Sequence, residues 1–214
     1  MFRKPVDTVA QRKFPLAMGA LKSHNSFPMN HSTNDLIMLF NDLFREDFRT
    51  ILVRGGEEPE YLPAGIATEL AQVVFAHGYY ASALHEISHW CIAGEKRRQL
   101  VDFGYWYEPD GRSAEKQREF EQVEVKPQAI EWILSKACGR NFNISTDNLN
   151  GDPAAIALGR VEFAKNVIKQ VRNYLLNGLP ADADVLKQAL LDYYQPGREI
   201  TSDDFQLNEL ITTQ

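Results

Sequence analysis

The sequence predicts an α+β fold: a mostly helical single domain with a small sheet, in which one helix carries a candidate metal site. Three observations lead to this prediction. The chain has 214 residues, which is enough for one domain with a full core and short for two. Its longer apolar stretches repeat at three- and four-residue intervals, as amphipathic helices do, and its shorter apolar runs are typical of strands. The motif "HEISH" would place two histidines one helical turn apart.

Composition and charge narrow the class of protein. Hydrophobic residues make up 44% and charged residues 24% of the chain, which is typical of soluble globular proteins. The net charge of −6 argues against nucleic acid or an anionic membrane as the main partner. We find neither an apolar run of membrane-helix length nor the apolar segment of a secretory signal. Cys91 and Cys138 lie far apart, so we expect two buried thiols and a cytoplasmic protein.

We expect residues 1–214 to form a single domain with two peripheral segments. Residues 1–30 are polar and basic and contain prolines, which suggests an arm laid over the surface. Residues 31–194 contain the periodic segments and should form the globular metal-binding core. Residues 195–214 are polar, and we expect a loose tail there.

The first half of the core should contain two helices and two strands. The segment "STNDLIMLFNDLFREDF" is amphipathic at helical spacing, with Ser32, Thr33 or Asn34 as its N-cap. The strands are "RTILVRGG" and "LAQVVFAHG", and the turn-rich segment "EEPEYLPAG" between them should be a loop. The second helix should cover Tyr79–Ala93 and end at Gly94, where a left-handed glycine is expected.

The second half should be mainly helical. The segment "VDFGYWYEPDGR" alternates around aromatic residues and closes on a Pro-Asp-Gly turn, which predicts a short strand. The stretch that begins at Ser113 should form one kinked helix or two shorter ones, because Pro127 lies inside it. A further helix should be capped by Asp152, begin at Pro153 and stop at Gly178. The segment "ADADVLKQALLDYY" should form the last helix.

The strongest functional signal is the H-E-x-x-H motif. His85 and His89 are four residues apart, so on a zincin-like HExxH helix both imidazoles can bind one cation. Glu86 would lie beside that cation, where a metalloprotease has its general base. The metzincin extension of the motif is absent, because Ile92 and Glu95 stand where it needs glycine and histidine. Glu95 is therefore a poor candidate for the third ligand.

A later helix offers better candidates for the third ligand. The segment "REFEQVEVKPQA" contains Glu119, Glu121 and Glu124. Glu121 and Glu124 share one helical face, and we choose Glu124 because it borders the apolar run "AIEWIL". Glu121 stays open as the alternative. Gln128, one turn beyond Glu124, would hydrogen-bond the ligand from behind.

These ligand types do not determine which metal is bound. Two histidines and one carboxylate suit catalytic zinc with one open position. The same set is the facial triad of non-haem Fe(II) oxygenases, which leaves positions open for oxygen and substrate. The HExxH motif occurs more often in zinc hydrolases, so the motif alone favours a zinc metallopeptidase of the HExxH-plus-Glu type. A non-catalytic binding module with structural zinc is disfavoured, because no fourth ligand is suitably spaced.

Three segments resemble the elongation factor P hydroxylase family of bacterial proteins: "GGEEPEYLPA", "GYYASALHEISHWCIAGEKRRQLVDFGYWYEPDGRS" and "EFEQVEVKPQAIEWI". The resemblance covers essentially the whole chain, and the aromatic segment after the HExxH motif is more specific than the motif itself. It implies an oxygen-dependent monooxygenase that hydroxylates the β-lysylated lysine of translation elongation factor P. It also implies iron as the metal, with His85 and His89 as ligands and Glu124 as the matching carboxylate.

A lysine that carries a lysyl extension needs a slot that binds ammonium groups. The segments "GGEEPEY" and "YWYEPD" would supply carboxylates and aromatic rings for ion pairs and cation–π contacts. The candidate substrate-binding residues are Glu57, Glu58, Glu60, Tyr105, Trp106, Tyr107, Glu108 and Asp110. The alternative is that they are ordinary solvated loop residues and core aromatics.

The roles of two further residues near the motif are less well defined. Glu86 is a catalytic candidate whose role stays open, and His77 is expected to be structural. No spacing identifies a co-substrate site, and the glycine pattern of a Rossmann fold is absent, which argues against a tightly held nicotinamide or flavin.

Overall fold

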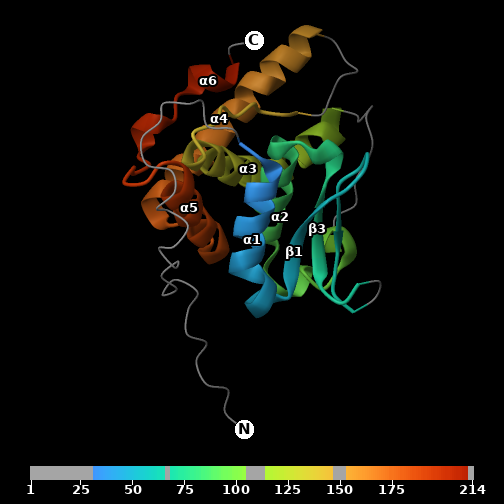
Figure 1. Cartoon of the computed structure of the whole chain (residues 1–214). Coiled ribbons are helices and arrows are strands. Elements are labelled where there is room, and N and C mark those ends of the chain that lie inside the picture. Colours follow the sequence, from blue (N-terminus) through green and yellow to red (C-terminus); the bar gives the residue numbers. More distant parts are fainter. Residues whose placement is uncertain (1–30, 66–67, 105–113, 147–152, 212–214) are drawn as a thin grey trace.

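The computed structural model of the protein describes residues 31–65, 68–104, 114–146 and 153–211, which form a mostly helical structure with a small sheet, as predicted (Figure 1). The elements are, in chain order, α1 (Thr33–Phe48), β1 (Thr50–Arg54), β2 (Glu60–Leu62), β3 (Ala71–Phe75), α2 (Tyr80–Arg97), α3 (Ala114–Ala137), α4 (Pro153–Asn177), α5 (Ala181–Tyr194) and α6 (Leu207–Ile211). Short 3₁₀ turns cover Ala76–Gly78, Val101–Gly104 and Ser202–Asp204. Within the described ranges, none of the helices combines the length and apolar character that crossing a bilayer requires.

α1 lies beside the sheet and forms one wall of the core (Figure 1). It begins as predicted, because the Ser32 hydroxyl accepts a hydrogen bond from the Asn34 N–H at 3.2 Å. Its apolar face carries Leu36, Leu39, Phe40, Leu43 and Phe44, all buried. Phe40 and Phe44 pack against Trp90 of α2, with ring centroids 5.2 and 4.8 Å apart. This aromatic contact fixes α2 against α1.

The sheet has three strands in the order β1-β3-β2. β1 runs parallel to β3, and β2 runs antiparallel to it, with Tyr61 opposite Val73. The prediction of a loop was wrong for Glu60–Leu62, which forms β2. Three residues are too few to show the alternation by which a strand is recognised. Tyr61 is nevertheless buried and stacked on Phe103 at 4.1 Å, and its N–H donates to the Asp102 carboxylate.

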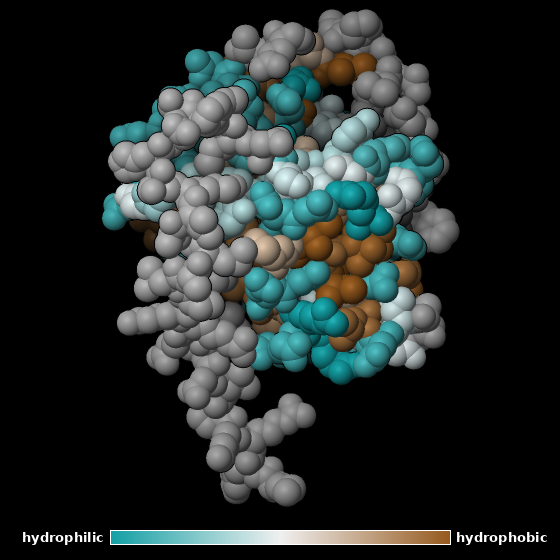
Figure 2. Space-filling view, viewed as in Figure 1, coloured by the Kyte–Doolittle hydropathy of each residue, from teal (hydrophilic) through white to brown (hydrophobic). Residues whose placement is uncertain are grey.

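One face of the sheet packs into the core, and the other is partly open. Leu52 of β1 is buried, whereas its neighbours Ile51 and Val53 are half-buried. Figure 2 shows apolar surface where Figure 1 places strands β1 and β3, bordered by hydrophilic residues. Gly55 follows β1, and a Cβ there would clash with the side chain of Val74. A larger residue at this position would therefore force the chain or Val74 to shift.

A tight turn leads from β3 into α2, the helix that holds the HExxH motif. His77 and Gly78 both have positive φ values, 53° and 69°, which glycine adopts freely and histidine at some cost. The Ser82 hydroxyl accepts a hydrogen bond from the Ala76 N–H across this turn, at 3.0 Å. At the other end Gly94, with φ 67°, interrupts the helix at the predicted position, and a further turn follows it.

The segment after α2 differs from its prediction. Val101–Gly104 forms a 3₁₀ turn and not the start of a strand, because its two central residues adopt left-handed backbone conformations. Its Phe103 ring is buried under β2. The remainder of the predicted strand, from Tyr105, lies outside the described residues, as do the predicted arm 1–30 and the predicted cap Asp152.

α3 is the central helix of the fold, because α2, α4 and α5 all pack against it. It is one continuous helix, although the sequence left open whether Pro127 would divide it. Pro127 has no backbone N–H to donate, but it is buried, and the helix continues through it. α4 begins at Pro153 and ends just before Gly178, as predicted.

The prediction of a loose tail beyond residue 194 was wrong for the part that contains Ser202–Asp204 and α6. Phe205 and Leu210 are almost fully buried, 0% and 1% exposed. The Phe205 ring packs edge-on against Trp132 of α3, with centroids 5.0 Å apart. Scattered apolar residues in a polar stretch are a weak signal in the sequence, but here they pack against the core, and Ile200 and Leu207 join Phe205 and Leu210 in doing so. Both cysteines are free thiols and buried, as expected.

Candidate metal centre

The candidate site lies where α2 packs against α3. α2 supplies His85 and His89, which are half-buried and in contact with α3. α3 supplies Glu124, Gln128 and Glu131, spaced so that they share one face of the helix. These three polar side chains are only 5%, 2% and 7% exposed. Buried polar groups need partners, and the two histidines of α2 provide partners for both carboxylates.

Three side chains present their ligand atoms to a common point. The Nε2 atoms of His85 and His89 are 3.1 Å apart. The Glu124 carboxylate lies 3.2 Å from His89 Nε2 and 3.5 Å from His85 Nε2. Ligands that bind one cation at about 2.0–2.2 Å lie about 3–3.5 Å from one another. The residues present therefore fit a single divalent cation, and all their ligand atoms are within 4.8 Å of each other.

Glu131 orients one of these histidines, and the sequence reasoning missed it. His85 Nδ1 and Glu131 Oε2 are 2.8 Å apart. With a proton on Nδ1 donating to this carboxylate, Nε2 faces the site, where a bound cation would take the place of its proton. Two signals could have identified Glu131. It is an acid inside the apolar run "AIEWIL", and it continues the helical spacing from Glu124 and Gln128.

Gln128 supports Glu124 from behind, where the sequence suggested it would lie. Its Nε2 donates to Glu124 Oε2 at 3.4 Å and to the Ser145 carbonyl at 2.7 Å. Its Oε1 accepts from the Ser145 N–H at 3.1 Å. The paired bonds to one backbone unit hold the amide rigidly. They fix which end of the amide faces the carboxylate.

The electrostatic surroundings favour positive charge between the helices. Burial disfavours the charged form of His85, but the neighbouring carboxylates, Glu131 first, outweigh it and raise the pKa of His85 to about 10. Burial also opposes charge on Glu124, yet its contacts with His89 and His85 lower its pKa to about 2. Burial raises the pKa of Glu131, and its hydrogen bond to His85 opposes that rise. A divalent cation would supply the positive charge that these groups favour.

Glu86 lies next to the site without joining the cluster of ligand atoms. It is half-buried, and burial raises the pKa of its carboxyl while His85 and His89 oppose the rise. The carboxylates of Glu124 and Glu131 on α3 act in the opposite sense to the histidines and favour a raised pKa of Glu86. A carboxylate in this place can accept a hydrogen bond or hold a proton close to the candidate cation.

The other candidate ligands are not part of the metal cluster. Glu121 accepts a hydrogen bond from Gln117 at 3.1 Å, and it is Glu124 that the fold places with His85 and His89. Glu119 and Glu95 are exposed.

The predicted substrate-binding acids that the structure describes are on the surface. Glu57, Glu58 and Glu60 are exposed, the first two in the connection between β1 and β2 and the third at the start of β2. His77 is also exposed, and its ring lies 3.9 Å from Glu57, so it takes no part in the metal cluster. The remaining candidates lie outside the described residues: Tyr105, Trp106, Tyr107, Glu108 and Asp110.

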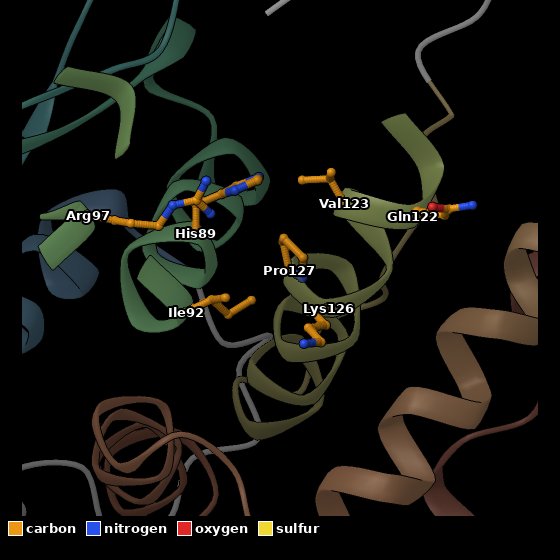
Figure 3. Close-up of a pocket in the computed structure, with 7 residues that line it drawn as sticks. All are labelled: His89, Ile92, Arg97, Gln122, Val123, Lys126 and Pro127. Atoms are coloured by element: carbon orange, nitrogen blue, oxygen red, sulfur yellow. The ribbon is translucent and has the colours of Figure 1, made fainter. Parts of the chain in front are cut away.

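A cavity of about 400 Å³ opens beside the metal cluster. Figure 3 shows it between α2 and α3, with His89 and Arg97 reaching from one helix toward Val123 and Pro127 on the other. The remaining lining residues are Ile92, Gln122 and Lys126. Because His89 forms part of the wall, a molecule in this cavity would reach the candidate metal ligand.

Comparison with known proteins identifies the family. Residues 39–205 match the family described as elongation factor P hydroxylase. The chain belongs to the elongation factor P hydroxylase family. A protein of Haemophilus influenzae named elongation factor P lysine hydroxylase is 49% identical over 185 residues, which cover 86% of this chain and 99% of the relative. The family resemblance found in the sequence is thereby confirmed, and the matched span contains both helices that build the metal cluster.

Proposed function

We propose that the protein hydroxylates the β-lysylated lysine of translation elongation factor P, with molecular oxygen and a metal held by His85, His89 and Glu124. The observation that carries this proposal is the cluster itself, two imidazoles and a carboxylate with their ligand atoms within 4.8 Å, inside the span that matches the hydroxylase family. The hydroxylase name of the relative supports the reaction type and the substrate protein. A cytoplasmic location follows from that substrate as part of the proposal.

We assign iron(II) as the metal. Two histidines and one carboxylate are the facial set of non-haem iron oxygenases, and bound iron would supply the redox chemistry that activates oxygen. With three protein ligands, such a metal would have positions open for oxygen or substrate. Glu131 and Gln128 keep His85 and Glu124 in their ligand orientations. Glu86 is the group placed to accept a hydrogen bond from the substrate or to hold a proton at its carboxylate.

The zinc metallopeptidase that the motif alone would favour is not supported by the comparisons. The family and the relative both carry the name of a hydroxylase.

The test is intact mass spectrometry of β-lysylated elongation factor P after incubation with the protein, iron(II), a reductant and air. We expect a gain of one oxygen atom on the modified lysine, absent under nitrogen and absent with His89→Ala. New peptide fragments that disappear with Glu86→Gln, without any oxygen gain, would show the hydrolytic use of the motif instead.

The exposed acids Glu57, Glu58 and Glu60 are proposed to bind the ammonium groups of the substrate. Replacing each by glutamine should reveal at least one variant with a several-fold higher KM for the substrate protein and unchanged metal content. Steady-state kinetics and metal analysis of the three variants check this. Three variants with wild-type KM would remove the loop from the proposal.

A further inference from the structure

The cavity beside the metal cluster has a charge that the lysine substrate does not explain. Its lining residues come from α2 (His89, Ile92 and Arg97) and from α3 (Gln122, Val123, Lys126 and Pro127). The two charged residues among them, Arg97 and Lys126, are both cations, and no carboxylate lines the described wall. A basic cavity stands out in a chain whose net charge is −6.

This lining selects anions over ammonium groups. The Arg97 guanidinium can bind a carboxylate through two parallel hydrogen bonds, and the Lys126 ammonium adds a second positive charge. A lysine side chain would instead meet repulsion from both. The apolar wall formed by Ile92, Val123 and Pro127 suits a short carbon skeleton. A volume of about 400 Å³ lies near the lower end of the range for small-molecule sites, so the ligand is compact.

Hydroxylation by oxygen also needs a reaction partner that donates electrons. Inserting one oxygen atom into a C–H bond leaves the second atom of O2 to be reduced by two electrons. The described residues offer no dithiol for this purpose, because Cys91 and Cys138 are both free, buried thiols. Cys91 moreover lies two residues from His89, and therefore on the opposite side of α2. The electrons must come from a molecule that binds near the metal.

We propose that the cavity between α2 and α3 binds a small reducing carboxylate, with Arg97 and Lys126 as its anion-binding residues and His89 at its inner end. This inference rests on the proposed function and names the class of its co-substrate. The target lysine then approaches the metal from another side.

Two kinds of reducing carboxylate satisfy the atom balance. With a 2-oxo acid, the C1–C2 bond breaks and CO2 leaves. One oxygen atom of O2 then ends in the new carboxylate, and the other is inserted into the lysine C–H bond. With an enediol acid, the two enediol O–H bonds break and the acid becomes a dicarbonyl. Their two hydrogen atoms and two electrons convert the second oxygen atom to water.

Direct binding tests the site without relying on turnover. Isothermal titration of the protein, metal-free and metal-loaded under nitrogen, would use 2-oxoglutarate, ascorbate and succinate as probes. We expect Lys126→Gln and Arg97→Gln each to weaken binding of the preferred acid roughly tenfold or more. Lys165→Gln is the matched control, because it removes the same charge from α4 and lines neither this cavity nor the neighbouring one. Circular dichroism of Lys126→Gln, whose side chain is exposed, guards against misfolding.

The outcomes separate the two reducing acids and the two proposals. Binding of 2-oxoglutarate or of ascorbate that both cavity variants weaken supports the inference and identifies the source. Equal binding of all three acids would overturn the reductant assignment, and binding unchanged in both variants would overturn the site. If elongation factor P gains oxygen but the cavity variants have wild-type KM for every acid, the proposed function survives and the inference fails. If the acids bind at the cavity but no oxygen is gained, the proposed function fails instead.

Discussion

A single buried carboxylate, Glu131, contacts the ring nitrogen of His85 that faces away from the candidate metal cluster. The 2.8 Å contact between Glu131 Oε2 and His85 Nδ1 favours a proton on Nδ1, on the far side of the ring from Glu124 and His89. Without that partner, either nitrogen of the imidazole could carry the proton, and the ring could rotate. Glu131 is therefore a positioning residue for the candidate metal, although it is not among the three candidate ligands.

Replacing Glu131 by glutamine should weaken metal binding without unfolding the protein. Because the amide can still accept a hydrogen bond but no longer carries charge, we expect metal affinity to fall about 10- to 100-fold. Competition titration with a chromophoric chelator measures the affinity. Glu119→Gln, an exposed change on the same helix, is the control. Equal affinity in Glu131→Gln and the wild type would show that His85 needs no such partner.

The sequence predicted the histidines of the site better than their surroundings, for physical reasons. Helical spacing alone brings His85 and His89 to one side of α2. The same spacing on α3 left both Glu121 and Glu124 as possible third ligands, because the face of α3 that is buried depends on packing against α2. The position of the Arg97 side chain could not be predicted from the sequence, for another reason. Gly94 breaks the helix, so the direction of residues beyond it no longer follows from 3.6 residues per turn.

At the scale of elements, Arg98 connects three parts of the fold. Its guanidinium lies 3.5 Å from the ring of Trp90, donates twice to the Trp90 carbonyl, and pairs with Asp182 of α5 at 2.6 Å. Its own carbonyl accepts a hydrogen bond from the Tyr61 hydroxyl of β2 at 2.9 Å. The end of α2 is thus tied to both α5 and the sheet. This anchors the helix that carries the histidines.

Arg98→Ala should be strongly destabilising. Arg98 and Asp182 are 9% and 19% exposed, so the change leaves a largely buried carboxylate without its partner, at a cost of roughly 3–5 kcal/mol. Arg98→Lys should recover only part of this, because lysine lacks the planar fork that stacks and bonds in several directions. Urea unfolding followed by tryptophan fluorescence measures the difference. Arg172→Ala, an exposed change on α4, is the control. A loss below about 1 kcal/mol would show that the pair is dispensable.

The elements that the sequence missed are held by tertiary contacts and not by local pattern. β2 has three residues, and its place depends on Tyr61 stacking on Phe103, a contact across a long sequence separation. The segment around α6 depends in the same way on Phe205 reaching Trp132. Local propensity and periodicity cannot detect such contacts, whereas they readily predict long amphipathic helices such as α1.

On the scale of the whole molecule, buried titratable groups join elements that are far apart in the chain. The Tyr80 hydroxyl lies 3.4 Å from Cys138 Sγ and 3.2 Å from the Tyr194 hydroxyl, which links the start of α2, the end of α3 and the end of α5. Burial raises the pKa of Cys138 to about 12, although its hydrogen bond to Tyr80 opposes the rise. Burial raises the pKa of Tyr80 as well. All three groups are thus kept protonated in the folded state at neutral pH.

This cluster should make the protein sensitive to alkali. The unfolded chain releases the thiol proton of Cys138 near pH 9.0, whereas the folded chain keeps it until about pH 12. The stabilisation is therefore complete below pH 9 and is lost as the pH rises between these values, at about 1.4 kcal/mol per pH unit for each such group. Denaturant unfolding at pH 8–11 should show a shallower pH slope for Cys138→Ala than for the wild type. Ser135→Ala, a buried change on α3 without a titratable group, should keep the wild-type slope. Parallel slopes for all three proteins would contradict the assignment.

Every candidate ligand comes from just two helices, and this has a mechanical consequence. A metal bound to His85 and Glu124 would act as a cross-link and close a loop of about 40 residues, which in chain-entropy terms is comparable to a disulfide of that span. Stripping the metal should therefore lower the melting temperature and speed amide hydrogen exchange along the facing turns of α2 and α3, while α1 and α6 change little. Mass spectrometry of exchange with and without metal would show it. Uniform acceleration over the whole chain would mean that the ion supports the fold everywhere, and no acceleration would mean that the two helices hold together without it.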